Sequence, residues 1–184
     1  MMKTHFDIEQ FIAAGSIHNE LDYERAMIAD RKLRLLAKDS AHFKNLRSKL
    51  RDLIETYEQQ HWSDPKAVTK EHLQESERAE QSAEVERLFI EKRKAVIRKK
   101  LKALDLTQEE LAQILGHKSK THMSELINGI KPFTLPDLVA IGLLLKIDLN
   151  ELVPVFLSPE KKHQINSALL QLNKPKLQKA EFAF

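Results

Sequence analysis

Apolar residues recur three and four positions apart along most of this chain, the spacing that gathers them on one face of an α-helix. Asn19 can cap a first helix that ends at Lys38, and residues 1–18 ahead of it are expected to form an arm. A second helix is predicted at 41–61. Alternation with a period of two, which marks strands, is scarce, and glycine occurs only 4 times and proline only 6 times. The pattern therefore predicts an all-α protein.

The helix predicted at 41–61 carries large apolar residues in a 3-4 repeat, so it needs another helix to pack against. Three partners fit this repeat: the preceding helix in a hairpin, the same helix of a second subunit, or another protein. Periodicity does not separate them. In this N-terminal helical region, 1–63, the side chains expected to bind a partner or a second copy are Tyr23, Phe43, Leu50, Leu53 and Tyr57.

A charged stretch follows, because Asp64-Pro65 interrupts the repeat and residues 66–84 contain almost no large apolar side chain. This composition fits a solvated helix or a partly disordered segment, so 64–86 is assigned as a charged helical or flexible linker. Apolar spacing resumes at Val85 and predicts a long helix that leads into Thr107.

Residues 106–129 contain the signals of two short helices joined by a tight turn. Thr107 and Glu110 can form a capping box, and Gly116 supplies the permissive backbone that ends the first helix. Ser119 can cap the second helix, which Asn128-Gly129 stops. These signals predict a helix-turn-helix, although they leave the start of the second helix open by a residue or two.

The second helix of this motif has two distinct faces. Met123, Leu126 and Ile127 lie at i, i+3 and i+4 and are expected to be core. The opposite face is small and polar and offers hydroxyls, an amide and one carboxylate: Thr121, Ser124, Glu125 and Asn128. Such a face fits a major groove and can hydrogen-bond to base edges.

Three further helices are predicted downstream. Thr134 with Asp137 forms a capping-box-like start, and Asp148 caps a short helix that reaches Val153. With the long helix and the two helices of the motif, these two complete a five-helix domain at 87–157. Residues 158–184 are expected to form a C-terminal helix and a basic tail.

The basic charge of the chain collects around the motif, although the whole chain carries only +3. Residues 92–131 hold 10 basic and 4 acidic side chains, a net of +6, whereas 1–63 are neutral, 64–91 net −4 and 132–184 net +1. DNA binding needs such a local basic footprint. A solvated helix face is the alternative explanation for Lys92, Arg93, Lys94 and Lys99 taken singly.

Composition argues against several classes of protein. No cysteine is present, and no apolar stretch approaches a membrane span or a signal peptide, so a cytoplasmic protein without membrane contact is expected. The eight histidines lack metal-ligand spacing, and no phosphate loop or nucleophile motif occurs. We therefore expect neither an enzyme nor a cofactor or metal.

The motif resembles the helix-turn-helix of the Xre and Cro-like repressors, except for a turn that is about one residue longer. The matching residues are Thr107, Gln108, Leu111, Ala112, Gly116, Ser124, Asn128 and Gly129. The wider chain resembles the HigA-type antitoxins over about 20–62 and 93–153, but has a charged insertion near 64–90 and extra residues after 154. This resemblance rests on Asp22-Tyr23-Glu24-x-Ala26, on Leu53-Ile54-Glu55-x-Tyr57-Glu58-x-x-His61 and on Ser124-Glu125-Leu126-x-Asn128-Gly129.

The HigA resemblance implies an antitoxin that neutralises an mRNA-cleaving toxin through its N-terminal helices and represses its own operon as a homodimer on double-stranded operator DNA. Two alternatives are a free-standing Xre-type repressor without a toxin and a helical protein-interaction module. Two recognition helices about one DNA turn apart would occlude a promoter.

Roles can be assigned to individual residues on this hypothesis. The resemblance implies that Gln108 grips the DNA backbone, and Lys118 and Lys131 flank the second helix as further phosphate contacts. The residues expected to read bases are Lys120, Thr121, Ser124 and Asn128, because Lys reads guanine acceptors and Asn reads adenine. Glu125 fits a structural or solvated role at least as well as a base-reading one. His122 is expected to be a surface residue without a role in base reading.

Overall fold

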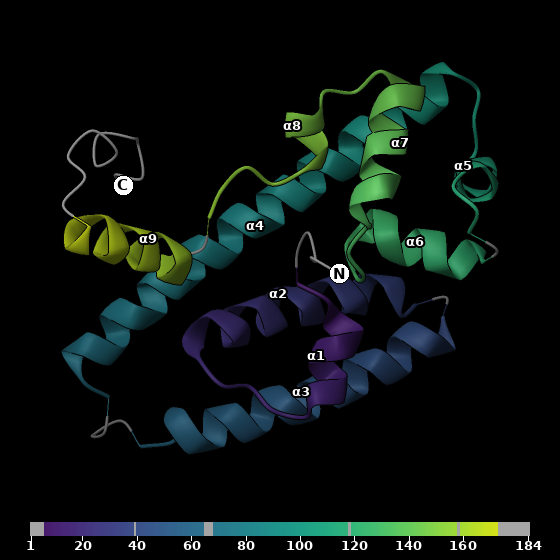
Figure 1. Cartoon of the computed structure of the whole chain (residues 1–184). Coiled ribbons are helices and arrows are strands. Elements are labelled where there is room, and N and C mark those ends of the chain that lie inside the picture. Colours follow the sequence, from purple (N-terminus) through teal and green to yellow (C-terminus); the bar gives the residue numbers. More distant parts are fainter. Residues whose placement is uncertain (1–5, 39, 65–67, 118, 158, 173–184) are drawn as a thin grey trace. The chain divides into compact units, whose positions relative to one another are not determined.

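The structure, a computed structural model, describes residues 6–38, 40–64, 68–117, 119–157 and 159–172. The described residues form helices and loops and contain no strand, which confirms the all-α prediction (Figure 1). The chain divides into two compact units, 1–154 and 155–184. The predicted regions 1–63 and 64–86 thus share one unit with the helix-turn-helix.

Three helices make up the N-terminal part: α1 (Ile8–Ala14), α2 (Glu20–Leu36) and α3 (Ala41–His61). Asn19 caps α2 as predicted, since its side chain accepts a hydrogen bond from the Asp22 amide. The arm predicted at 1–18 is wrong over α1. Ile8 is buried and its amide donates to the carbonyl of Ile130, a tertiary contact that periodicity cannot reveal.

Helices α2 and α3 form a hairpin, so α2 covers the apolar repeat of α3 (Figure 1). Phe43, Leu50 and Tyr57 are buried in its core and Leu53 packs against it. Tyr23 stacks on Tyr57 with 5.1 Å between ring centroids. Packing within the chain thus involves all five side chains assigned to partner binding, although Tyr23 and Leu53 remain partly exposed.

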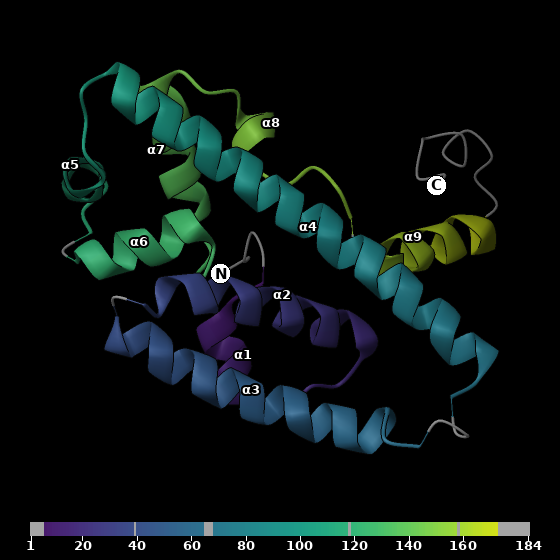
Figure 2. The same ribbon diagram turned by 180° about the vertical axis from the view of Figure 1, so that it is seen from behind.

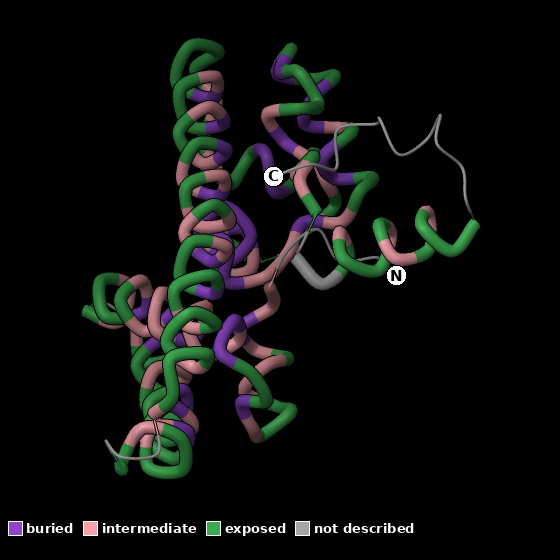
Figure 3. The backbone as a smooth tube through the Cα atoms, turned by 90° about the vertical axis from the view of Figure 1, so that its left-hand side faces the viewer, coloured by how far each residue is buried: buried purple, intermediate pink, exposed green. Residues whose placement is uncertain are grey.

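Helix α4 (Lys70–Ala103) runs without a break through the predicted linker and into the helix-turn-helix domain. Of the two alternatives for 64–86, the helical one holds from Lys70 onward. Ala79 and Ala83 are buried against α2, since small side chains let two helices approach closely. Figure 3 marks buried and exposed residues along the tube of each helix, α4 included. The stretch is thus a packed structural element as well as a connection.

Four helices complete the first unit: α5 (Gln108–Ile114), α6 (Lys120–Asn128), α7 (Leu135–Leu145) and α8 (Leu149–Leu152). With the end of α4 they make the five-helix arrangement that the sequence predicts. The capping box of Thr134 and Asp137 is present at the start of α7. Their shared core comprises Ile97, Leu101, Leu111, Ala112, Met123, Leu126, Ile127, Phe133, Leu138, Ile141, Leu145, Ile147 and Leu152.

The second unit contains α9 (Pro159–Gln171), which matches the C-terminal helix that the sequence predicts. The predicted basic tail lies outside the described residues.

Candidate nucleic-acid interface

Helix α5 begins with the predicted capping box. The Thr107 amide donates to Glu110 Oε2 at 2.7 Å, and the Glu110 amide donates to Thr107 Oγ1 at 3.1 Å. These hydrogen bonds lower the pKa of the Glu110 carboxyl, the backbone bond contributing most. The start of α5 is therefore held at a defined position, with Gln108 in its first turn.

The turn between α5 and α6 depends on Gly116, whose φ of 79° lies in the left-handed region. Ser119 caps α6 as predicted, accepting from the His122 amide at 3.3 Å. Gly129, with a φ of 68°, ends α6, and the Ile130 amide donates to the Glu125 carbonyl at 2.8 Å. The two helices thus meet across a tight turn, with α6 running from Lys120 to Asn128.

The exposed face of α6 lies toward its amino end. Lys120 and Thr121 are exposed and Ser124 is half-buried, as the base-reading assignment requires. Lys120 Nζ lies 2.5 Å from Glu109 Oε1 of α5, and its side chain is 81% exposed. This face offers a long cation and two hydroxyls.

Asn128, by contrast, does not lie on that face, and its predicted orientation is wrong. The residue is 4% exposed, and its Nδ2 donates to the Ser124 carbonyl at 2.8 Å and to Ser124 Oγ at 3.2 Å. The side chain therefore binds back onto its own helix near the groove between α2 and α4. In this conformation Asn128 stabilises the end of α6 and presents no amide to a base edge.

Glu125 is also buried, at 3% exposure, where the helical wheel places it on the outer face. Its carboxylate accepts from His42 Nε2 of α3 at 2.7 Å and pairs with Lys131 Nζ at 2.9 Å. Burial raises the pKa of Glu125, but the hydrogen bonds from Lys131 and His42 outweigh this and leave it lowered. The structural role considered for Glu125 thus holds, because α1 and α3 cover this side of α6.

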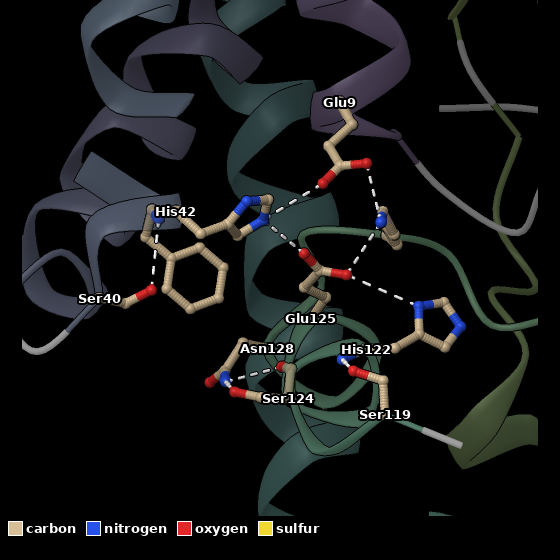
Figure 4. A network of polar contacts seen from close by, with 10 residues as sticks. Glu9, Ser40, His42, Ser119, His122, Ser124, Glu125 and Asn128 are labelled. Carbon is tan, nitrogen blue, oxygen red and sulfur yellow. Dashed lines mark hydrogen bonds and ion pairs between the residues drawn. The ribbon is translucent and has the colours of Figure 1, made fainter. Parts of the chain in front are cut away.

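The phosphate role predicted for Lys131 conflicts with its position in the same network. Lys131 Nζ lies 2.7 Å from Glu9 Oε2 of α1, while Glu9 Oε1 lies 3.3 Å from His42 Nε2. Figure 4 shows Glu9, His42 and Glu125 converging from three helices. The ammonium of Lys131 is thus engaged by two carboxylates. Lys118, the other lysine assigned to phosphate, lies outside the described residues.

This network contains the group that most resembles a metal site within the described part of the chain. The nearest ligand atoms of Glu9, His42 and Glu125 lie within 4.8 Å of one another. Lys131 already supplies a cation to both carboxylates. An ion-pair network that joins α1, α3 and α6 is therefore enough to explain why these three side chains lie together.

Gln108 lies in a groove of about 380 Å³ that also contains Arg98 and Lys102 from the end of α4. Both basic residues are exposed. The groove also contains Asp105, so its lining carries an amide, two cations and one carboxylate, a net charge of +1 that can attract phosphate. Sequence reasoning missed Arg98 and Lys102, although their i, i+4 spacing on the helix ahead of Thr107 was a usable signal.

Not every cation in 92–131 is available to DNA. Arg93, grouped with the solvated face, is buried, donates to the Leu152 carbonyl at 3.3 Å and lies over the rings of Phe89 and Phe133. Burial lowers its pKa to about 10. The exposed basic charge is thus smaller than the +6 of the segment, because Arg93 is buried and Lys131 is paired with Glu9 and Glu125.

None of the helices within the described ranges is both long enough and apolar enough to span a membrane. Comparison with curated proteins and with solved structures gave no match. A family comparison did give one: residues 97–152 match the HTH_3 helix-turn-helix model, which starts inside α4 and ends with α8. This match covers less than a third of the chain, and it supports a helix-turn-helix domain of the Xre/Cro-like type at residues 97–152.

Proposed function

We propose that this chain is a transcription repressor that binds operator DNA with α6 in the major groove. The observation that carries this proposal is a polar face within a matched helix-turn-helix domain, formed by the exposed Lys120 and Thr121 and the half-buried Ser124. Short hydroxyl side chains let a helix approach base edges closely, and a lysine reaches guanine acceptors. Specificity would rest on these three residues.

Affinity would come from phosphate contacts next to α6. Gln108, Arg98 and Lys102 line one groove together with Asp105, and its net positive charge would attract the DNA backbone. Lys118 remains a candidate from its place in the sequence. Lys131 would contact phosphate only if its pairs with Glu9 and Glu125 opened.

A homodimer is proposed because one recognition helix covers only one half-site. The support is an apolar stripe on α7, where Leu135, Val139 and Leu143 lie four residues apart and are exposed, Leu143 by 78%. The only charged residue within α7 is Asp137, which is buried. Two copies could therefore bring this stripe together without burying a charge.

The finer proposal is that the repressor is an antitoxin. It rests on the resemblance of 20–62 to HigA-type antitoxins, and the hairpin of α2 and α3 provides a folded surface for a toxin. That surface would consist of exposed residues, since those first assigned to the toxin are packed within the chain. Co-expression with the product of an adjacent gene tests this proposal, which predicts a stable complex and relief of toxicity. A harmless, non-binding neighbour would leave the free-standing repressor.

DNA binding is tested by selecting sequences from a random duplex library and measuring affinity by fluorescence anisotropy. Thr121→Ala and Ser124→Ala should alter the selected sequence, with a loss of about 1–3 kcal/mol at the affected base pair. Lys102→Ala should weaken binding to all sequences and reduce the salt dependence by about one phosphate contact. Lys70→Ala, which removes the same charge from the far end of α4, is the control (Figure 1). Absence of DNA affinity at low salt would refute the proposal.

A further inference from the structure

A groove of about 500 Å³ lies between α2 and α4 and reaches the carboxyl end of α6. Figure 2 shows α2 beside α4, with α6 close to the end of α2. Its lining combines an apolar wall with charged side chains from both long helices and one residue of the recognition helix: Ile28, Arg31, Lys32, Leu35, Leu36, Glu84, Arg87, Glu91, Lys94 and Asn128.

The charges in this groove do not balance. Four cations face two carboxylates, an excess of +2. Arg87 pairs with Glu84 at 2.7 Å, but Lys32 and Lys94 share Glu91 at 3.8 and 3.7 Å. One carboxylate therefore serves two ammonium groups at distances too long for good hydrogen bonds.

Arg31 is the fourth of these cations. It forms no ion pair closer than 4 Å with the part of the chain that the structure describes, although the charges of Glu24 and Glu84 act on it from further away. The excess positive charge thus faces the open space of the groove.

Lys32 is the most recessed of these cations, with a side chain only 15% exposed. Burial, with smaller contributions from the charges of Lys94, Arg93 and Arg87, lowers its pKa to about 8 against the opposing effect of Glu91. A negatively charged ligand would relieve this unfavourable environment.

We propose that the groove binds a small molecule that carries a phosphate monoester and an apolar group. A phosphate monoester has a charge near −2 at neutral pH, which matches the excess of +2. Lys32, Lys94 and Arg31 would contact the phosphate, and Ile28, Leu35 and Leu36 would contact the apolar part.

The phosphates of a DNA duplex fit this groove less well. Each carries a single charge, and a rigid duplex cannot approach a side chain as recessed as Lys32. The groove is concave and has an apolar wall, which is typical of small-molecule sites.

The position of the groove suggests that its ligand regulates DNA binding, an extension that rests on the proposed repressor function. Asn128 lines the groove and bonds to Ser124 on α6. A ligand that shifts Asn128 would therefore act on a helix turn that carries a base-reading candidate.

Calorimetric titration of the full chain with phenyl phosphate tests the site without DNA, so its outcome is independent of the repressor function. Phenyl phosphate should bind more tightly than inorganic phosphate or phenol, since only it has both parts. Binding should take up protons at pH 8, where Lys32 is about half protonated, and fewer at pH 7. Buffers of different ionisation enthalpy measure this uptake.

Two variants and a control complete the experiment. Lys32→Met should weaken phenyl phosphate binding by about tenfold or more and abolish the proton uptake, and Lys94→Ala should weaken it without abolishing the uptake. Arg34→Ala, on an exposed part of α2 outside the groove, should leave binding unchanged. Thermal unfolding confirms that each variant is folded.

The proposal fails if phenyl phosphate binds more weakly than about 1 mM, or equally well to wild type and Lys32→Met. It also fails if Lys32→Met lowers DNA affinity while phenyl phosphate does not bind, because the groove would then serve the DNA backbone.

Discussion

His42 of α3 lies 2.7 Å from the buried Glu125 carboxylate of α6, measured from Nε2 to Oε1. This contact joins residues 83 positions apart and links the candidate recognition helix to the N-terminal hairpin. Lys131 and Glu9 close the network from the other side. The N-terminal helices therefore help to hold α6, and a change in one is expected to reach the other.

Replacing Glu125 with Gln should destabilise the fold by about 1–3 kcal/mol, because Lys131 and His42 lose the buried carboxylate that accepts their hydrogen bonds. Urea unfolding followed by circular dichroism measures this loss. Glu109→Gln, an exposed residue of α5, is the matched control and should cost less than about 1 kcal/mol. Equal effects of the two changes would contradict the role assigned to the network.

The network also predicts that the stability of the fold depends on pH in the acidic range. The pKa of Glu125 is lowered in the folded chain, so its stabilisation is present above the ordinary carboxyl value of 4.5 and is lost as the pH falls through the lowered value. The difference in unfolding free energy between wild type and Glu125→Gln should therefore shrink from pH 6 toward pH 3. A difference that stayed constant over this range would argue that Glu125 gains nothing from its charge.

Gly129 should tolerate no side chain. An added Cβ would lie 2.6 Å from Ile90 Cγ2, and its φ is 68°, so Gly129→Ala combines a clash with backbone strain. Gly116→Ala is an informative control because its φ is also positive, at 79°, but nothing lies within 4 Å of the new Cβ. Thermal unfolding should show that the free energy of unfolding falls by about 1–2 kcal/mol for Gly116→Ala and by clearly more for Gly129→Ala.

Asn128→Ala should reduce stability without changing the preferred DNA sequence. Its buried amide donates to Ser124, so its loss removes about 1 kcal/mol of hydrogen bonding at the end of α6. Chemical denaturation and sequence selection on the same variant measure the two effects separately. Altered preference at a single base pair would restore Asn128 as a base reader.

Local signals were sufficient for the helices and their ends. Asn19, Thr107, Ser119 and Thr134 each cap the helix that the sequence predicts, because an N-cap hydrogen bond forms within three residues of the capping side chain. The apolar spacing of α6 likewise identified its core face, since that face packs within the same five-helix domain.

Such local signals did not predict contacts between segments that are distant in the sequence. A helical wheel placed Glu125 and Asn128 outward, but α1, α2 and α3 cover that side of α6. The ion pairs of Lys131 could not be foreseen for the same reason, since its partner Glu9 lies more than a hundred residues earlier.

The sequence by itself determined the all-α class, the positions of most helices and the helix-turn-helix at residues 106–129, because these depend on interactions over a few residues. Only the tertiary structure decided that α2 covers α3, that the charged stretch belongs to one long packed helix, and that α6 is held by Glu9 and His42. Those outcomes depend on which surfaces meet in space, and residue spacing along the chain carries no information about that choice.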